Sequence, residues 1–200
     1  MENENNTEEL LLDGSVNEAP QESEAEEAEK EQYVPKNRFE KALYSVYKND
    51  TLNPILHVLS YAIVALTAYA FIWRTVNLIV SDIWQAVWLL LVTGVPFVLV
   101  SIARKLINAP RPYELLEFYQ QKPKAKRAES FPSRHVFSVT VIGVCLIPWS
   151  LFVGIGILLL GVALASIRVL LGIHFIRDVV AGAAIGVLSG VIGLLLNHII

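Results

Sequence analysis

Two histidines lie in settings that could support catalysis. His174 and Asp178 are four residues apart, and on a helix this spacing brings a carboxylate close enough to bond one ring nitrogen and fix its tautomer. The other nitrogen would then be free to attack an electrophile. His135 ends the cluster Pro-Ser-Arg-His within the stretch FPSRHVFS. A second imidazole in this position could protonate a leaving oxygen.

Cationic side chains accompany both histidines. Arg104 and Arg111 are seven residues apart, which is two helical turns, so they share one helix face until Pro110 and Pro112 end the helix. Guanidinium groups bind phosphate oxygens in a bidentate manner. The candidates for holding a phosphate are Arg104, Lys105, Arg111, Ser133, Arg134 and Arg168. Together with an activated histidine and a second histidine as acid, they suit phosphoryl transfer to water.

A metal site is the alternative interpretation of the same residues. Two histidines and one aspartate could ligate zinc. Three or more neighbouring arginines would repel a cation, so we expect no metal and no cofactor.

The elements that must position these residues are apolar helices. The chain has 200 residues, 54% of them apolar, with a mean hydropathy of +0.49. Its apolar stretches follow residue 52 and suit helices that span a bilayer of about 30 Å. We predict an all-α membrane bundle of five transmembrane helices without strands, at residues 54–73, 83–103, 135–149, 151–167 and 174–200.

This topology would bring the candidate charged residues to one face of the membrane. If the spans alternate in direction, the end of the second, the start of the third, the end of the fourth and the start of the fifth share one membrane face. All the candidate residues fall at these four places. A charged side chain within a span costs roughly 2.5 to 3.5 kcal/mol at the helix centre, so charged residues in or beside spans usually mark function.

Two further segments flank the first span. Residues 1–32 carry twelve acidic residues against Lys30, so we predict a disordered acidic leader over residues 1–35 and a membrane domain over residues 36–200. Residues 37–48 have a helical period of apolar residues. They are either an amphipathic helix on the membrane surface or a first packed helix of the domain.

Three short motifs resemble those of the type-2 phosphatidic acid phosphatases, also called the lipid phosphate phosphatases. The family pattern is Lys-x6-Arg-Pro, then Pro-Ser-Gly-His, then Ser-Arg-x5-His-x3-Asp. This chain has RKLINAPRP from Arg104, PSRH from Pro132 and IRVLLGIHFIRD from Ile167, with the gaps intact. Three motifs in order, on one predicted face, are a specific signal, and the likeness covers residues from about 52 to the end.

The resemblance implies a role for each matching residue. His174 would become a phosphohistidine, Asp178 would orient it, and His135 would protonate the leaving alkoxide. The phosphoryl oxygens would be held, without a metal, by Arg104, Arg111, Ser133 and Arg168. The chain departs from the pattern at three positions, where Arg104 replaces Lys, Arg134 replaces Gly and Ile167 replaces Ser, although Ser166 is adjacent to the last.

The expected substrate is a lipid phosphate, namely phosphatidate, phosphatidylglycerophosphate or an isoprenyl phosphate or diphosphate. We expect the membrane as the other partner and no nucleic acid. Vanadium-dependent haloperoxidases carry similar motifs but are mostly soluble, and a non-catalytic scaffold is the other alternative.

The membrane orientation is open to two arguments. Beyond the candidate residues, basic residues concentrate on the membrane face that carries the predicted site. By the positive-inside rule this face is the cytoplasmic side of the membrane, which we expect to be the cell membrane. Members of the resembled family usually work on the outer side. The charge bias favours the cytoplasmic side.

Overall fold

Within residues 33–119 and 128–197, which the computed structural model describes, the chain forms helices and no strand. This confirms the predicted all-α class. Nearly all of the predicted leader lies outside the described residues, as does the basic sequence KPKAKR at residues 122–127. The helices are α2 (Arg38–Lys48), α3 (Leu52–Ser81), α4 (Ile83–Ile107), α5 (Pro112–Leu115), the 3-10 helix η1 (Glu117–Tyr119), α6 (Arg134–Leu146), α7 (Leu151–Leu170) and α8 (Ile176–Asn197).

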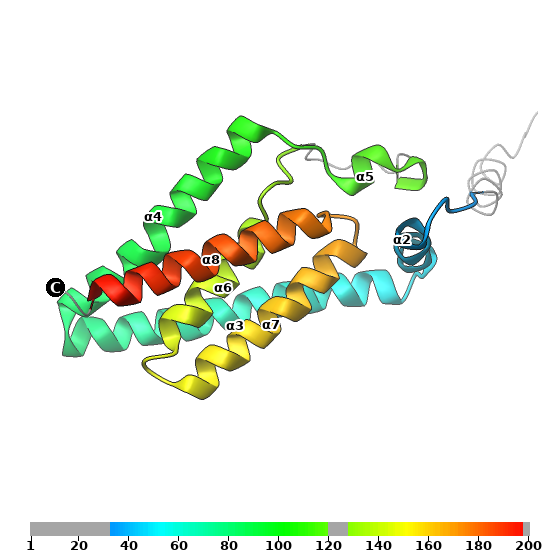
Figure 1. The fold of residues 1–200 in the computed structure, drawn as a ribbon. Coiled ribbons are helices and arrows are strands. Elements are labelled where there is room, and N and C mark those ends of the chain that lie inside the picture. Colours follow the sequence, from blue (N-terminus) through cyan, green and yellow to red (C-terminus); the bar gives the residue numbers. More distant parts are fainter. Residues whose placement is uncertain (1–32, 120–127, 198–200) are drawn as a thin grey trace, which may run out of the picture. The chain divides into compact units, whose positions relative to one another are not determined.

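The five predicted spans correspond to four long helices and one short one. Helices α3, α4, α7 and α8 are long and apolar enough to cross a membrane. Helix α6 has 13 residues, or about 20 Å at 1.5 Å per residue, which is shorter than a bilayer core. It lies among α3, α4, α7 and α8 and contacts all four (Figure 1). Because protein surrounds α6, its length need not match the thickness of the lipid.

Helix α3 extends eight residues beyond the predicted end of the first span. The polar residues Arg74 and Asn77 follow the predicted end of the span, yet the helix continues through them. The amide of Asn77 donates to the Trp73 carbonyl at 2.7 Å, so its polar group is satisfied within the helix. The chain turns at Asp82, whose carboxylate caps α4 by accepting hydrogen bonds from the backbone N–H groups of residues 84 and 85.

Helix α2 is a packed part of the domain. Asn37 caps it by accepting a hydrogen bond from the Glu40 N–H at 2.9 Å. Leu43 and Val46 are buried, and α2 contacts α3 and α7. Aromatic contacts then join α2 to the connection after α4, with Tyr47 lying 4.9 Å from Tyr119 between ring centroids. The sequence leaves two interpretations open for residues 37–48, and these contacts agree with a helix that packs against the rest of the domain.

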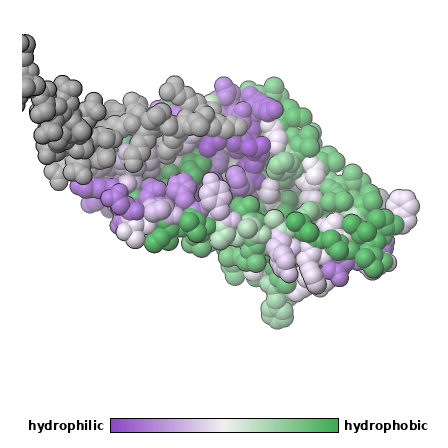
Figure 2. Space-filling view, turned by 180° about the vertical axis from the view of Figure 1, so that it is seen from behind, coloured by the Kyte–Doolittle hydropathy of each residue, from purple (hydrophilic) through white to green (hydrophobic). Residues whose placement is uncertain are grey.

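The outer surface of the bundle suits lipid. Large apolar side chains are exposed along the long helices, for example Val58 on α3, Leu99 on α4 and Phe152 on α7. Figure 2 shows hydrophilic surface toward the end where Figure 1 places α2 and α5, and hydrophobic surface over most of the remaining visible side. The polar end is therefore the end that meets water and lipid headgroups.

Helices α6 and α8 pack closely because glycines of α8 face the backbone of α6. A Cβ atom at Gly182 would lie 2.5 Å from the Ser133 carbonyl oxygen, and one at Gly186 would lie 2.9 Å from the Phe137 carbonyl oxygen. Both distances are too short for a methyl group. Small residues at such positions let membrane helices approach one another.

We therefore expect Gly182→Ala to destabilise the bundle by about 1 to 3 kcal/mol, because the added methyl group forces the two backbones apart. The measurement is the midpoint of thermal unfolding in detergent. Gly156→Ala on α7 is the matched control, since a Cβ there meets nothing within 4 Å. Equal midpoints for the two variants would contradict the close α6–α8 contact.

Candidate active site

The predicted site residues meet at one end of the bundle, although they come from distant parts of the chain. Residues at the end of α4, in the following connection, at the start of α6, at the end of α7 and before α8 contribute to it. The charges of Arg168, His174, Arg134 and Arg104 all act on the imidazole of His135, which places these five residues in one electrostatic neighbourhood.

His174 lies in a short turn between α7 and α8. Its N–H and that of Ile173 donate to the Arg168 carbonyl at 3.3 and 3.1 Å, which ties the turn to the end of α7. Gly172 has a φ of +64°, and a Cβ there would lie 2.7 Å from the Tyr119 hydroxyl oxygen. Only glycine fits both conditions comfortably. The turn therefore sets the direction of the histidine.

A buried serine stands between His174 and Asp178. The Ser130 Oγ lies 3.2 Å from the His174 Nδ1 and donates a short hydrogen bond to the Asp178 Oδ2. The direct distance from Nδ1 to the same carboxylate oxygen is 3.6 Å. Asp178 is thus close to the imidazole, as its spacing predicts, but the shorter contact of Nδ1 is with Ser130.

These hydrogen bonds assign the tautomer of His174. Because the Ser130 proton goes to the carboxylate, the Ser130 oxygen is left as an acceptor for a proton on Nδ1. A second donor, the Phe175 N–H, holds the same carboxylate oxygen at 2.9 Å. The Nε2 lone pair of a neutral His174 is then available for attack.

The electrostatic setting also favours neutral His174. Burial lowers the pKa of its imidazole below the ordinary value, and the positive charges of Arg111 and Arg104 lower the pKa further. The hydrogen bond and charge of Asp178 act in the opposite direction. The net lowering keeps the side chain unprotonated at neutral pH.

Sequence reasoning missed Ser130. It lies two residues before the Pro-Ser-Arg-His cluster, and its side chain is fully buried. Nothing in its residue type separates it from other loop serines. Its position immediately before a candidate motif is the only signal that the sequence offered.

Arg104 is buried at the end of α4 and holds the segment before α6 in place. Its guanidinium donates to the carbonyls of Ser130 at 3.3 Å and Pro132 at 2.5 Å, and also to the carbonyl of Glu129. A planar guanidinium suits such a set of acceptors better than a lysine ammonium does. Arg104 thus has a positioning contact in addition to the phosphate contact predicted for it.

The remaining cations differ in their exposure. Arg111 is half-buried, donates from Nε to the Ala128 carbonyl at 3.0 Å and lies over the Tyr113 ring. Arg134 is also half-buried and begins α6. Lys105 is exposed, and no contact with another predicted site residue is found for it within the described parts of the chain.

Several buried donors at this end have no hydrogen-bond partner among the described residues. They are the Nε and Nη2 of Arg168, the Nε of Arg104 and the Oγ of Ser133. Arg168 is only 5% exposed and Ser133 is fully buried. Leaving a buried donor unpaired costs about 1 to 3 kcal/mol. An anion with several acceptor oxygens, such as a phosphoryl group, would satisfy these donors together.

Ile167, where the family pattern has serine, is part of the apolar core. It is buried there with Leu164 and Leu171. The neighbouring Ser166 is exposed, and its hydroxyl donates to the Val162 carbonyl at 3.1 Å within α7. Ser166 therefore does not supply the hydroxyl that the family pattern has at position 167.

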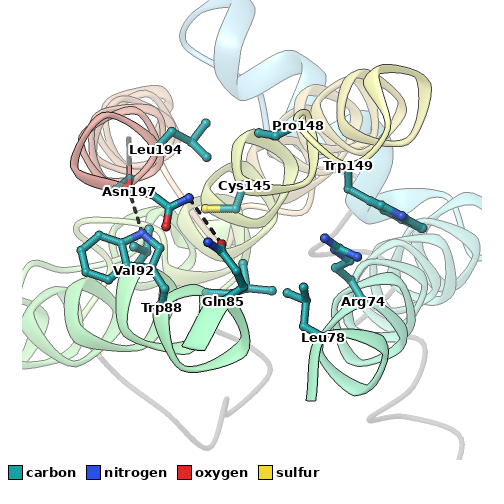
Figure 3. Close-up of a pocket in the computed structure, with 12 residues that line it drawn as sticks. Arg74, Leu78, Gln85, Trp88, Val92, Cys145, Pro148, Trp149, Leu194 and Asn197 are labelled. Atoms are coloured by element: carbon teal, nitrogen blue, oxygen red, sulfur yellow. Dashed lines mark hydrogen bonds between the residues drawn. The ribbon is translucent and has the colours of Figure 1, made fainter. Parts of the chain in front are cut away.

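A separate pocket of about 180 Å³ lies at the other end of α3, α4 and α8. In this pocket the Trp88 indole donates to the Gly193 carbonyl, the Asn197 amide donates to Gln85, and Arg74 lies over the Trp149 ring (Figure 3). None of the predicted site residues lines it. The predicted site residues are at the opposite end of these helices.

Comparisons with known proteins agree with this architecture. A family model described as the PAP2 superfamily matches residues 85–198, which include every predicted site residue. The crystal structure of Aquifex aeolicus LpxE is similar, with a TM-score of 0.58 and 24% identity over 74% of this chain and 87% of that chain. None of the curated proteins gives a significant match.

A second similar crystal structure is that of a transmembrane PAP2-type phosphatidylglycerolphosphate phosphatase from Bacillus subtilis. It has a TM-score of 0.62 and 20% identity, over 92% of this chain and 89% of that chain. At these identities both likenesses concern the fold.

Proposed function

The chain belongs to the PAP2 superfamily, and from this premise we propose that it is an integral-membrane phosphatase that hydrolyses a lipid phosphate through a phosphohistidine. The observation that carries the proposal is the set of buried, unpartnered donors on Arg168, Ser133 and Arg104 beside His174. A phosphoryl group is the ligand whose oxygens match them.

In the first step, the Nε2 of His174 attacks the phosphorus atom. The bond from phosphorus to the lipid oxygen breaks, and that oxygen takes a proton from His135, which must enter this step protonated; the negative charge of the bound phosphoryl group favours that form. The ring of His174 becomes positively charged when the new bond forms. The Ser130 Oγ stabilises this charge by accepting the hydrogen bond of Nδ1–H, and the Asp178 carboxylate, which is 3.6 Å from Nδ1 and accepts from Ser130, stabilises it electrostatically.

In the second step, water attacks the phosphorus atom of the phosphohistidine. His135, now neutral, takes a proton from this water, and the bond between phosphorus and nitrogen breaks. Inorganic phosphate leaves, and both histidines return to their starting states. The guanidinium groups stabilise the charge on the phosphoryl oxygens in both transition states.

The direct test is phosphate release by the purified protein from micellar lipid phosphates, without added metal and with a chelator present. We expect hydrolysis of at least one of phosphatidate, phosphatidylglycerophosphate and an isoprenyl diphosphate. The exposed apolar side chains along the long helices and the name of the Bacillus neighbour both support a lipid substrate. An inactive protein that is folded in the same detergent would refute the proposal.

We also propose that the catalytic end faces the cytoplasm, on the basis of the basic residues near it. Single cysteines at Lys41 and Ser81, in a background with Cys145→Ala, mark the two ends, since both positions are exposed. An impermeant thiol reagent applied to intact cells is expected to label position 81 and not position 41. Labelling of position 41 from outside would reverse the orientation.

A further inference from the structure

A groove of about 340 Å³ runs along α6 from its first residues and is walled by α3, α4 and α6. Its walls are mainly apolar and include Val64 and Ala68 from α3, Phe97 from α4 and Ile142 from α6. Two adjacent residues at the start of α6, Arg134 and His135, also line it. An apolar chain would fit along the walls, and a polar group would fit beside these two residues.

Arg134 is the residue of this groove that the family pattern does not explain, because the pattern has glycine at its position. Its side chain is half-buried, and no hydrogen bond or ion pair is found for it within residues 33–119 and 128–197. Its charge acts on both Arg104 and His135. A half-buried cation beside another cation is unfavourable unless an anion compensates it.

The position of Arg134 indicates which part of a substrate would supply this anion. The reacting phosphoryl group is matched by the unpartnered donors of Arg168, Ser133 and Arg104. His135 protonates the leaving oxygen, so the leaving group continues from His135 into the groove. Arg134 adjoins His135 in this groove and therefore faces the leaving group.

Building on the proposed function, we propose that Arg134 binds a second phosphate within the leaving group. This inference names the substrate class as lipids with two phosphates near the scissile bond. In an isoprenyl diphosphate the second phosphate is directly attached to the reacting one, and in phosphatidylglycerophosphate it is separated by glycerol. Phosphatidate has no second phosphate and would leave Arg134 uncompensated.

The test compares matched substrates by their kcat/KM values. One pair is phosphatidylglycerophosphate and phosphatidate with the same acyl chains, and the other is an isoprenyl diphosphate and monophosphate of the same length. The variants are Arg134→Gln, Arg134→Gly and Arg134→Lys. The control is Lys41→Gln, which removes an exposed cation from α2.

We expect Arg134→Gln and Arg134→Gly to lower the ratio of two-phosphate to one-phosphate activity at least about tenfold, in line with loss of a charge-assisted hydrogen bond. Arg134→Lys should retain part of the preference, and Lys41→Gln should retain all of it. The substrate pair whose activity ratio falls more in these variants shows which spacing of the two phosphates Arg134 recognises. Each ratio is taken within one preparation, so partial misfolding of a variant cancels.

Two results would overturn the inference in different ways. If the wild type is active and both ratios are unchanged in the Arg134 variants, with all substrates losing activity equally, Arg134 has a general electrostatic role and the proposed function still stands. If the wild type hydrolyses none of the four substrates, the proposed function fails and the inference fails with it.

Discussion

His174→Ala abolishes turnover in the mechanism proposed here, with an expected loss of about four orders of magnitude or more in kcat. The variant lacks the nitrogen that forms the phosphoenzyme in this mechanism, and its smaller side chain leaves Ser130 and Asp178 without the imidazole. The measurements are phosphate release and acid-labile labelling of the protein by a radioactive lipid phosphate. Both should vanish.

The control for this variant is His57→Ala on α3, which removes an imidazole that lines neither the site nor the groove described above. It should keep nearly full activity. A His174→Ala variant with unchanged labelling would refute the role of His174 as nucleophile.

The same residue gives a pH dependence. The nucleophile must be neutral, and burial together with nearby arginines lowers the pKa of His174 below its ordinary value near 6.5. The rate of phosphoenzyme formation, which requires neutral His174, should therefore stay high just below pH 6.5 and fall only at more acidic pH.

His135→Ala should have an effect that depends on the leaving group. For alkyl esters, including lipid phosphates, we expect a loss of about 10² to 10⁴-fold, because the departing alkoxide no longer receives a proton. For a nitrophenyl phosphate the leaving oxygen is far less basic, so the loss in the first step should be much smaller and phosphoenzyme should accumulate. The measurement is burst-phase and steady-state kinetics with both substrates.

His57→Ala on α3, which lies outside the groove that contains His135, is also the control for His135→Ala. It should show the same leaving-group dependence as the wild type. An equal loss for good and poor leaving groups in His135→Ala would argue against proton donation by this residue.

The sequence predicted the helix class and the convergence of distant residues, because both follow from simple physical rules. Apolar runs of membrane length specify spans, and alternation of their direction brings the start of α6 and the end of α7 to the same face. The tight spacing from His174 to Asp178 similarly predicted that these two side chains lie close together.

The sequence did not predict features that depend on tertiary contacts. The length of α3 was underestimated because hydrogen bonding within the helix satisfies Asn77, which local polarity alone does not reveal. Ser130 is held in the site by tertiary contacts: Arg104 donates to the carbonyls of residues 129 and 130, and the Ser130 N–H donates to the Ala109 carbonyl. The groove beside Arg134 likewise exists only once α3, α4 and α6 are assembled.

The unpartnered donors at Arg168 and Ser133 have a consequence for the resting protein. Each unsatisfied group weakens the empty fold, and any phosphate-like anion that fills the pocket restores what is missing. Binding of an anion in the pocket should therefore raise the free energy of unfolding. The protein without a bound anion is then less stable than the protein with one. Its product, inorganic phosphate, should raise the temperature of thermal unfolding and should also compete with the substrate for the pocket.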